Sequence, residues 1–360
     1  MFTRALALGL ASGLALATAS FAEDLTRPPP KEAFAGQKSA TSITTPGCND
    51  SSFAQVPGHN DLFLTRFHKG CKPGGDWTVV LDHFDWTANA FTTVKTVIAT
   101  PQQIEGATLN SAYDPYPANY GGEIWVAFEC SGANIAGAST CLAPMNPQNF
   151  TTDPSRTYVA ISGNRNAPGN QYSASDPKLF SYEGRIFLYW TTVVMNNGKW
   201  VGIATRGAEL VQEPGGQRRL WAKGSGGRAI EAFDPRLSVE VWAHADMFSI
   251  IQAGPKIYAT AGNAEGACVS PSKDLPGCFQ LTIAESDVPI GQDIFNRDQA
   301  NGNKLPTVGQ EYARFAEAPS GQLVIIGHFV PHAHPWFQQR PMSASAGVAA
   351  FPVDVGALFR

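Results

Sequence analysis

The stretch that decides the fold reads Ser173-Ala174-Ser175-Asp176-Pro177-Lys178-Leu179-Phe180 and leads into the turn Tyr182-Glu183-Gly184. The turn is followed by Arg185-Ile186-Phe187-Leu188-Tyr189-Trp190, a run of β-branched and aromatic residues that is typical of a buried β-strand. The same order recurs upstream, where Ser111-Ala112-Tyr113-Asp114-Pro115-Tyr116 precedes Tyr120-Gly121-Gly122 and another apolar run. An Asp-Pro pair, a glycine turn and a strand therefore form one repeated β-hairpin unit.

Five segments of the chain follow this plan. Their anchor residues are Asp61, Asp114, Asp176, Asp246 and Arg314. These anchors recur at steps of roughly 50 to 70 residues, about the length of one propeller blade. Helical periodicity is nearly absent, and 35 Gly and 26 Pro residues interrupt the strand-like runs. The pattern predicts an all-β protein with a five-bladed β-propeller. The alternative is a two-sheet sandwich, which does not require Asp at the same place in successive repeats.

The beginning of the sequence indicates export. Arg4 precedes an apolar run of about a dozen residues, and Ser20-Phe21-Ala22 places small residues before Glu23, as in a secretory signal peptide. We therefore expect a signal peptide at 1–22, an N-terminal arm at 23–45 and a single propeller domain at 46–360. The mature protein would be secreted or periplasmic.

The six cysteines agree with an oxidising compartment, because an even number in an exported chain suggests disulfides. Sequence neighbours favour the pairs Cys48–Cys71, Cys130–Cys141 and Cys268–Cys278, since each closes a short loop. Their spacings match no zinc-binding pattern.

The charge of the chain argues against two kinds of partner. Lys and Arg together number 26 and Asp and Glu 30, which gives a net charge of −4. A slightly acidic chain lacks the basic surface that nucleic acid or an anionic membrane attracts. We expect neither partner, and we expect a monomer.

The repeated acidic residues point to a shared pocket. In a propeller the inner strand of each blade runs beside the central axis, so equivalent positions of all blades meet. Asp61, Asp114, Asp176 and Asp246 would then converge with Arg314. Burying several carboxylates is costly, and their mutual repulsion separates their pKa values, as acid/base chemistry requires. The structural alternative is that Asp-Pro merely starts a strand by turn chemistry.

These motifs resemble those of the five-bladed propeller glycoside hydrolases, a group that includes arabinanases, β-xylosidases, arabinofuranosidases, invertases and levansucrases. The resemblance rests on Asp114-Pro115 before Gly121-Gly122, on Asp176-Pro177 before Gly184, and on Pro57-Gly58-His59-Asn60 before a strand-like run. It implies a carbohydrate substrate, no required cofactor and hydrolysis by three carboxyl groups on different blades. One Asp is the general base, a second Asp orients the acid and tunes its pKa, and a Glu is the general acid.

The assignment of these roles depends on which blade is counted first. The Pro-Gly-His-Asn stretch resembles a motif of the last blade in arabinanase-like members, so the blades here can be offset by one. In the offset register, which we prefer, Asp114 is the base, Asp246 the orienting carboxylate and Glu311 the acid of an inverting enzyme. In the register without offset, Asp61 is the base, Asp176 tunes the acid and Asp246 replaces the Glu.

Further residues near the predicted inner strands are expected to bind substrate: Asp61, Asp176, Arg314, Tyr113 and His244. By the same resemblance, His59 would point down the axis and hold a structural calcium ion or ordered water; the alternative is a hydrogen-bonded loop histidine.

Two classes of function remain open. The first is an exported glycoside hydrolase that acts on poly- or oligosaccharide. The second is a non-catalytic propeller that binds glycan or another protein. The four aspartates favour the first, whereas the missing Glu-Gly-Pro motif of active family members and the unusual Arg314 favour the second.

Overall fold

The computed structural model describes residues 41–43, 52–68, 77–164, 170–196, 199–212, 218–263, 280–295, 299–301, 309–330 and 348–359. Strands dominate these residues, with the 3-10 helix Pro154–Arg156 and the short helix α1 (Val355–Leu358). No helix in this part of the chain has the length and apolar character needed to cross a bilayer. The predicted signal peptide and the arm up to residue 40 lie outside the described residues.

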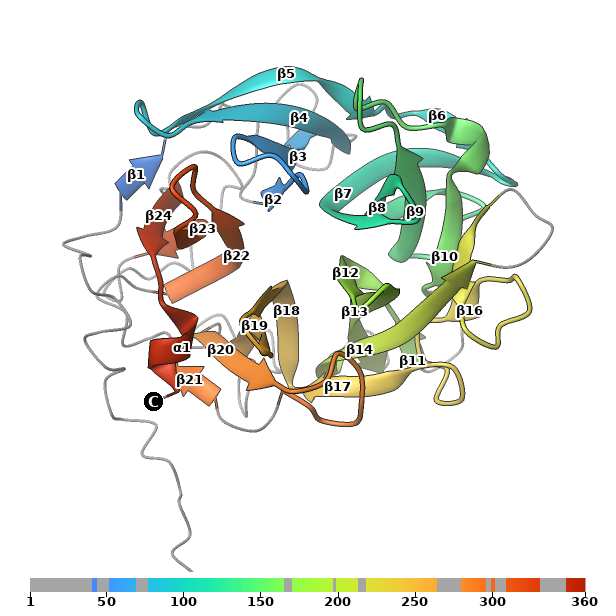
Figure 1. Cartoon of the computed structure of the whole chain (residues 1–360). Helices are drawn as coiled ribbons and strands as arrows, with labels where there is room; N and C mark the ends of the chain where they lie inside the picture. Colours follow the sequence, from blue (N-terminus) through green and yellow to red (C-terminus); the bar gives the residue numbers. More distant parts are fainter. Residues whose placement is uncertain are drawn as a thin grey trace, which may run out of the picture.

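The described strands form five hydrogen-bonded sheets, which we number in chain order (Figure 1). Sheet 1 contains β2 (Ala54–Gln55), β3 (Leu62–His68), β4 (Trp77–Asp85) and β5 (Ala90–Ile98). Sheet 2 contains β6 (Gln102–Ile104), β7 (Ala107–Tyr120), β8 (Glu123–Ala133), β9 (Ser139–Met145), β10 (Tyr158–Ser162) and β16 (Ile230–Glu231). Sheet 3 contains β11 (Asn170–Tyr172), β12 (Ser175–Tyr182), β13 (Arg185–Asn196), β14 (Lys199–Gln212), β15 (Leu220–Ala222) and β17 (Val239–Ala243). Sheet 4 contains β18 (Ala245–Ala253), β19 (Lys256–Asn263), β20 (Gln280–Ser286) and β21 (Gln299–Asn301). Sheet 5 contains β22 (Gly309–Glu317), β23 (Leu323–Val330), β24 (Val348–Pro352) and β1 (Thr41–Ile43).

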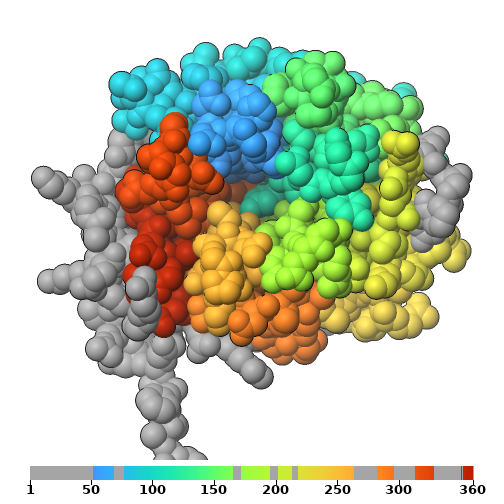
Figure 2. Space-filling model, viewed as in Figure 1, coloured from blue at the N-terminus to red at the C-terminus, as the bar shows by residue number. Residues whose placement is uncertain are grey.

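The sheets surround a central axis, with β2, β7, β12, β18 and β22 nearest to it (Figure 1). The space-filling view is hollowed at its centre, where segments of different sheets meet (Figure 2). Each pair of neighbouring sheets shares a hydrophobic cluster; Trp125 of sheet 2 and Trp190 of sheet 3, for example, pack in one of them. Such face-to-face burial all round the axis defines a propeller, so the predicted all-β propeller is confirmed.

Sheet 5 closes the ring. Its outermost strand, β1, pairs antiparallel with β24. A segment near the start of the chain therefore completes the sheet that is formed by the last strands of the chain. Thr41–Ile43 falls within the stretch predicted as an arm, and here it belongs to the propeller.

The glycine turns form the hairpins that the sequence predicted. Gly121 and Gly122 have φ of 61° and 81°, and Glu183 and Gly184 have φ of 50° and 72°. Two consecutive residues with positive φ are the signature of a two-residue hairpin turn that matches strand twist. These turns start the antiparallel pairing of β7 with β8 and of β12 with β13.

One predicted disulfide is confirmed, because Cys130 and Cys141 are bonded and link β8 to β9 inside the core. Cys48, Cys71, Cys268 and Cys278 lie outside the described residues, so the other two pairs remain predictions.

Candidate active site

A β-bulge recurs at a similar height along the central axis in four of the inner strands. The ladder register shifts between Tyr113 and Tyr116 in β7, between Ser175 and Lys178 in β12, between Met247 and Ser249 in β18, and between Glu311 and Arg314 in β22. A β-bulge bends the strand locally and changes the direction of its side chains. The repeated bulge therefore defines the level of the axis at which functional side chains gather.

The Asp-Pro pairs explain two of these bulges. Asp114 and Asp176 both have φ of 46°, a left-handed conformation that Asp tolerates better than most residues. Pro115 and Pro177 follow, and proline suits a bulge because it has no N–H to leave unpaired. The conformational preference of Asp-Pro and the functional placement of the aspartates are therefore compatible. The same bulge that Asp-Pro favours also directs both carboxylates toward the axis.

Threonines of neighbouring strands fix the same level. Thr140 Oγ1 donates to the carbonyl of Ala174, and Thr205 Oγ1 donates to that of Ala245, at 2.8 and 2.9 Å. Ala174 lies two residues before Asp176, and Ala245 lies directly before Asp246. Each bond joins one sheet to the next, so the inner strands are held in position relative to one another.

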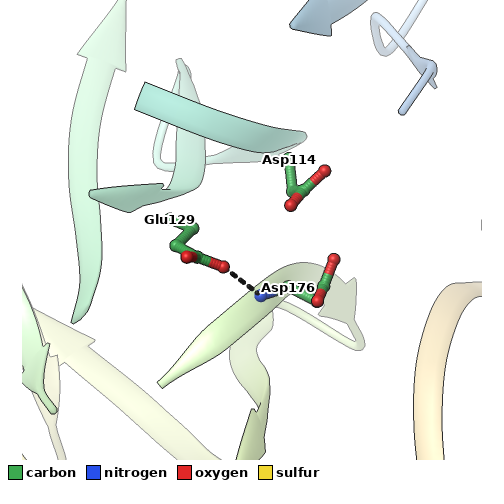
Figure 3. Close-up of side chains that lie close together, drawn as sticks. All are labelled: Asp114, Glu129 and Asp176. Carbon is green, nitrogen blue, oxygen red and sulfur yellow. Dashed lines mark hydrogen bonds between the residues drawn. The ribbon is translucent and has the colours of Figure 1, made fainter. Parts of the chain in front are cut away.

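Three carboxyl groups form the centre of the site (Figure 3). One carboxylate oxygen from each of Asp114, Glu129 and Asp176 lies within 4.8 Å of the others. The carboxyl groups of Asp114 and Asp176 face each other from β7 and β12, while Glu129 comes from β8 and accepts a 3.4 Å hydrogen bond from the backbone N–H of Asp176. Asp114 and Asp176 are buried, with 2% and 9% of their surface exposed, whereas Glu129 is half-buried.

A fourth carboxylate, Asp246 of β18, lies at the same site. It is half-buried and accepts a 2.5 Å hydrogen bond from Thr191 Oγ1 of the neighbouring sheet. Sheets 2, 3 and 4 therefore each contribute at least one carboxyl group.

Three buried cations lie near these four carboxyl groups and offset part of their negative charge. Arg66 of β3 forms an ion pair with Asp114, with Nη1 at 3.1 Å from Oδ1. Lys178 of β12 is fully buried, and its ammonium group donates to the carbonyl of Asp176. Arg314 of β22 is 1% exposed. Positive charges among buried carboxylates reduce the cost of desolvating both.

Tyr116 connects inner strands of different sheets. Its hydroxyl group, from β7, accepts a hydrogen bond from the backbone N–H of Ile250 at 3.1 Å and lies 3.0 Å from Ser249 Oγ, both on β18. The guanidinium of Arg314 packs over its ring at 5.4 Å from the centroid. Tyr116 therefore joins sheets 2, 4 and 5.

The crowding of charges perturbs their titration. Burial of its carboxyl group raises the pKa of Glu129 to about 7, and the negative charge of Asp114 adds to this rise. Burial and the same charge place the pKa of Asp176 well above its ordinary value. Burial also raises the pKa of Asp246, although the charge of Lys178 and the hydrogen bond from Thr191 oppose it.

Lys178 is perturbed in the opposite sense. Burial lowers its pKa to about 8, and the like charge of Arg314 contributes. The site therefore contains two groups, Glu129 and Lys178, with pKa values close to neutrality, which is characteristic of acid/base sites.

Four of the five predicted ring residues meet here, namely Asp114, Asp176, Asp246 and Arg314. They do not occupy one equivalent strand position, as the sequence analysis expected. By ladder register, Asp246 corresponds to the residue before Asp114, and Arg314 corresponds to Tyr116. The expectation of strict equivalence was wrong because the bulges, which fix the register, are not visible in a sequence.

The placement predicted for Asp61 is also wrong. The innermost strand of sheet 1 is β2, and Asp61 lies in the turn between β2 and β3, where it contacts His83 at 3.3 Å and is 48% exposed. It precedes Arg66, which contacts Asp114, by five residues of extended chain, or roughly 16 Å. Pro57-Gly58, taken as the lead into an inner strand, forms the turn itself, and Gly58 has φ of 81°.

The remaining predicted residues lie near the site in different ways. Tyr113 is half-buried beside Asp114, with its hydroxyl group 3.4 Å from Ser131 Oγ. His244 is exposed at the start of β18, two residues from Asp246. Glu311 lies on β22 opposite His328, at the ladder position that corresponds to Asp246; its side chain is not among those described.

His59 lies in the β2–β3 turn, and its ring packs edge-on against Phe150 at 5.3 Å. Within the described residues, the acidic group whose oxygen spacing suits a metal ion is Asp114, Glu129 and Asp176, which does not include His59. Arg66 and Lys178 supply two positive charges beside these three carboxyl groups.

Sequence reasoning missed Glu129, Lys178 and Arg66. Each is a charged residue within an otherwise apolar strand, as in Glu123-Ile124-Trp125-Val126-Ala127-Phe128-Glu129 and Lys178-Leu179-Phe180. That signal was available, because a charge in a buried strand is rare unless it is paired.

No protein-family profile matches the sequence, and no curated protein is similar to it in sequence. Solved structures, however, share its fold. An endo-arabinase from Bacteroides thetaiotaomicron VPI-5482 is 11% identical, with 88% of this chain and 98% of that chain covered and a TM-score of 0.53. A thermostable family-43 glycoside hydrolase is 11% identical, with 87% and 91% covered and a TM-score of 0.51. An α-L-arabinofuranosidase from Lactobacillus brevis is 9% identical, with 84% and 90% covered and a TM-score of 0.51.

The chain therefore has the fold of the arabinanase-like glycoside hydrolase propellers, and the resemblance drawn from its motifs is confirmed at the level of the fold.

Proposed function

We propose that this protein is an exported glycoside hydrolase that cleaves poly- or oligosaccharide by acid/base catalysis at the axial carboxyl cluster. The observation that carries the proposal is the convergence of Asp114, Glu129, Asp176 and Asp246 from three sheets, with raised pKa values for three of them. Glycosidic hydrolysis needs two carboxyl groups in different protonation states on either side of one bond.

Access to solvent divides the four groups into two pairs. Asp246 and Glu129 are half-buried, so part of each residue is open to solvent, whereas Asp114 and Asp176 are buried. We assign activation of water to Asp246, because Thr191 and Lys178 both stabilise its ionised form. The sequence predicted this role for Asp114, which instead forms an ion pair with Arg66. We assign to Asp114 an electrostatic role, because its negative charge raises the pKa of Glu129.

Asp246 is suited to the base role for a second reason. A general base works best when its pKa lies near the working pH, and burial raises the pKa of Asp246 from the low value of a free carboxyl group. In an inverting reaction Asp246 would accept a proton from water as the water oxygen attacks the anomeric carbon. Glu311, predicted as the acid, remains a candidate on the neighbouring inner strand β22.

The fold relatives, which include an endo-arabinase and an α-L-arabinofuranosidase, support a first choice of substrates. Arabinan and aryl arabinofuranosides are therefore the first substrates to test, followed by xylan, fructan and aryl xylosides. Reducing-sugar release by wild type, lost in Asp246→Asn, supports the proposal.

A non-catalytic glycan-binding propeller is the second candidate, favoured by the missing Glu-Gly-Pro motif. If wild type binds one of these glycans in calorimetry yet cleaves none, the binding function replaces hydrolysis.

A further inference from the structure

Glu129 is the carboxyl group at the site for which neither sequence register provides a role. It lies on β8, the second strand of sheet 2, and its ladder partner is Tyr113, the residue before Asp114. We infer that Glu129 is the proton donor of the active site, a role that rests on the proposed hydrolysis.

The first step of the argument is electrostatic. Carboxylate oxygens of Asp114, Glu129 and Asp176 lie within 4.8 Å of one another, and like charges this close cannot all be ionised without a large penalty. At least one proton is therefore retained by the group near neutral pH. The same logic separates acid from base in enzymes that use paired carboxyl groups.

The second step concerns which carboxyl group holds a transferable proton. Asp114 is ion-paired with Arg66, which favours its ionised form. Glu129 has no cation within ion-pair distance in the described part of the chain, and its hydrogen bond from the Asp176 N–H is long, at 3.4 Å. The balance of partners leaves the proton to Glu129 or Asp176.

The third step is access. Asp176 is 9% exposed, and its Oδ1 is buried without a hydrogen-bond partner among the described residues. Glu129 is half-buried, so it has more surface open to solvent than Asp176 has. The carboxyl group of Asp176, close to that of Glu129, then resists ionisation of the pair. The raised pKa of Glu129, about 7, agrees with a group that is protonated in slightly acidic solution.

The step that follows is balanced as written. Glu129 gives its proton to the glycosidic oxygen while the bond between that oxygen and the anomeric carbon breaks, with the electron pair passing to the oxygen. A water oxygen bonds to the anomeric carbon, and its proton passes to Asp246. The products are two sugar hydroxyl groups, a Glu129 carboxylate and a protonated Asp246, and one proton returned through solvent restores both groups.

The test compares Glu129→Gln with Glu311→Gln and with the control Glu123→Gln. Glu123 lies on the same strand β8 but pairs with Arg156 at 2.6 Å, away from the cluster. Each variant is assayed on an oligosaccharide, whose leaving group needs a proton, and on a dinitrophenyl glycoside, whose leaving group does not. We expect Glu129→Gln to lose about 10²- to 10⁴-fold in kcat/KM on the oligosaccharide and little on the dinitrophenyl glycoside. Its pH profile should also lose the limb near pH 7.

Several results would overturn the inference. Equal losses on both substrates would mean that Glu129 is structural, and the leaving-group pattern in Glu311→Gln alone would place the acid on β22. Inactivation by EDTA with recovery in calcium would show a bound cation where the proton is required.

Carboxyl ¹³C NMR gives a readout without turnover, since a Glu signal that titrates near pH 7 should disappear in Glu129→Gln. A wild type that cleaves no substrate refutes the proposed function, whereas an active wild type with an unaffected Glu129→Gln refutes this role alone.

Discussion

Replacement of Glu129 by Gln should make the protein more stable at alkaline pH. Glu129 has a pKa of about 7 in the folded chain, against 4.5 for an unperturbed Glu, because of its burial and the charge of Asp114. Between these two values the unfolded chain releases this proton while the folded chain keeps it, so the unfolded state is favoured as pH rises. The free energy of unfolding therefore falls as pH rises from about 4.5 to about 7.

The size of the effect follows from the shift. Each pKa unit corresponds to about 1.4 kcal/mol, so a shift from 4.5 to about 7 corresponds to on the order of 3 kcal/mol at pH 8, as an upper bound. Glutamine has nearly the same shape and no charge to desolvate. Glu129→Gln should consequently gain up to about 3 kcal/mol over wild type at pH 8 and nothing at pH 4.5.

The assay is urea unfolding, followed by tryptophan fluorescence at pH 5, 6, 7 and 8. Wild type should lose stability across this range, and the difference between variant and wild type should grow with pH. Part of the wild-type slope should persist, because the raised pKa values of Asp176 and Asp246 act in the same direction.

Glu123→Gln is the matched control, because it changes the same residue type on the same strand. The side-chain hydrogen bond from Arg156 lowers the pKa of Glu123, so this group contributes stability above about pH 4.5 that is lost as pH falls. The control should cost up to about 1 kcal/mol at pH 7. If Glu129→Gln is less stable than wild type at pH 8, or if its difference from wild type does not vary with pH, the electrostatic account of the cluster is wrong.

Three further outcomes are expected. Asp61→Asn should leave kcat/KM within about twofold of wild type and the free energy of unfolding within about 0.5 kcal/mol, because Asp61 is exposed in a turn. A loss of kcat/KM beyond about tenfold would instead support Asp61 as the base, as in the register without offset. Thr191→Val should raise the pKa of Asp246 further, because it removes the 2.5 Å hydrogen bond to its carboxylate. The acidic limb of the pH–rate profile should then move to higher pH, and an unmoved limb counts against Asp246 as the base. Arg66→Met should cost about 3–5 kcal/mol in urea unfolding, because Asp114 would remain buried without its partner; a loss below about 1 kcal/mol would show that water replaces the guanidinium.

The repeat made most of the fold predictable. Asp114-Pro115 and Asp176-Pro177, each followed by a glycine turn and an apolar run, identify two hairpins in the correct register. These local signals work because a left-handed residue, a proline and a two-residue turn each restrict the backbone on their own. The same motifs brought Asp114 and Asp176 to the axis.

The rest of the site depends on information that local sequence does not contain. Glu129 reaches the carboxyl cluster from the second strand of its sheet, and only the ladder between β7 and β8 shows that it lies beside Asp114. Asp61 was misplaced because a Pro-Gly turn between β2 and β3 was taken as the approach to an inner strand. Strand order and bulge position are long-range properties, so a repeat predicts them only where every unit is regular.

The central claim, that the axial carboxyl groups hydrolyse a glycosidic bond with Asp246 activating the water, is tested most directly by watching the product form. Proton NMR of wild type with an aryl arabinofuranoside, or with whichever glycoside the screen identifies, reports the anomeric configuration of the first sugar released. We predict that wild type releases the sugar with inverted configuration and that Asp246→Asn, although folded, releases none. Release at the wild-type rate by Asp246→Asn, or first-formed sugar of retained configuration, would contradict the account.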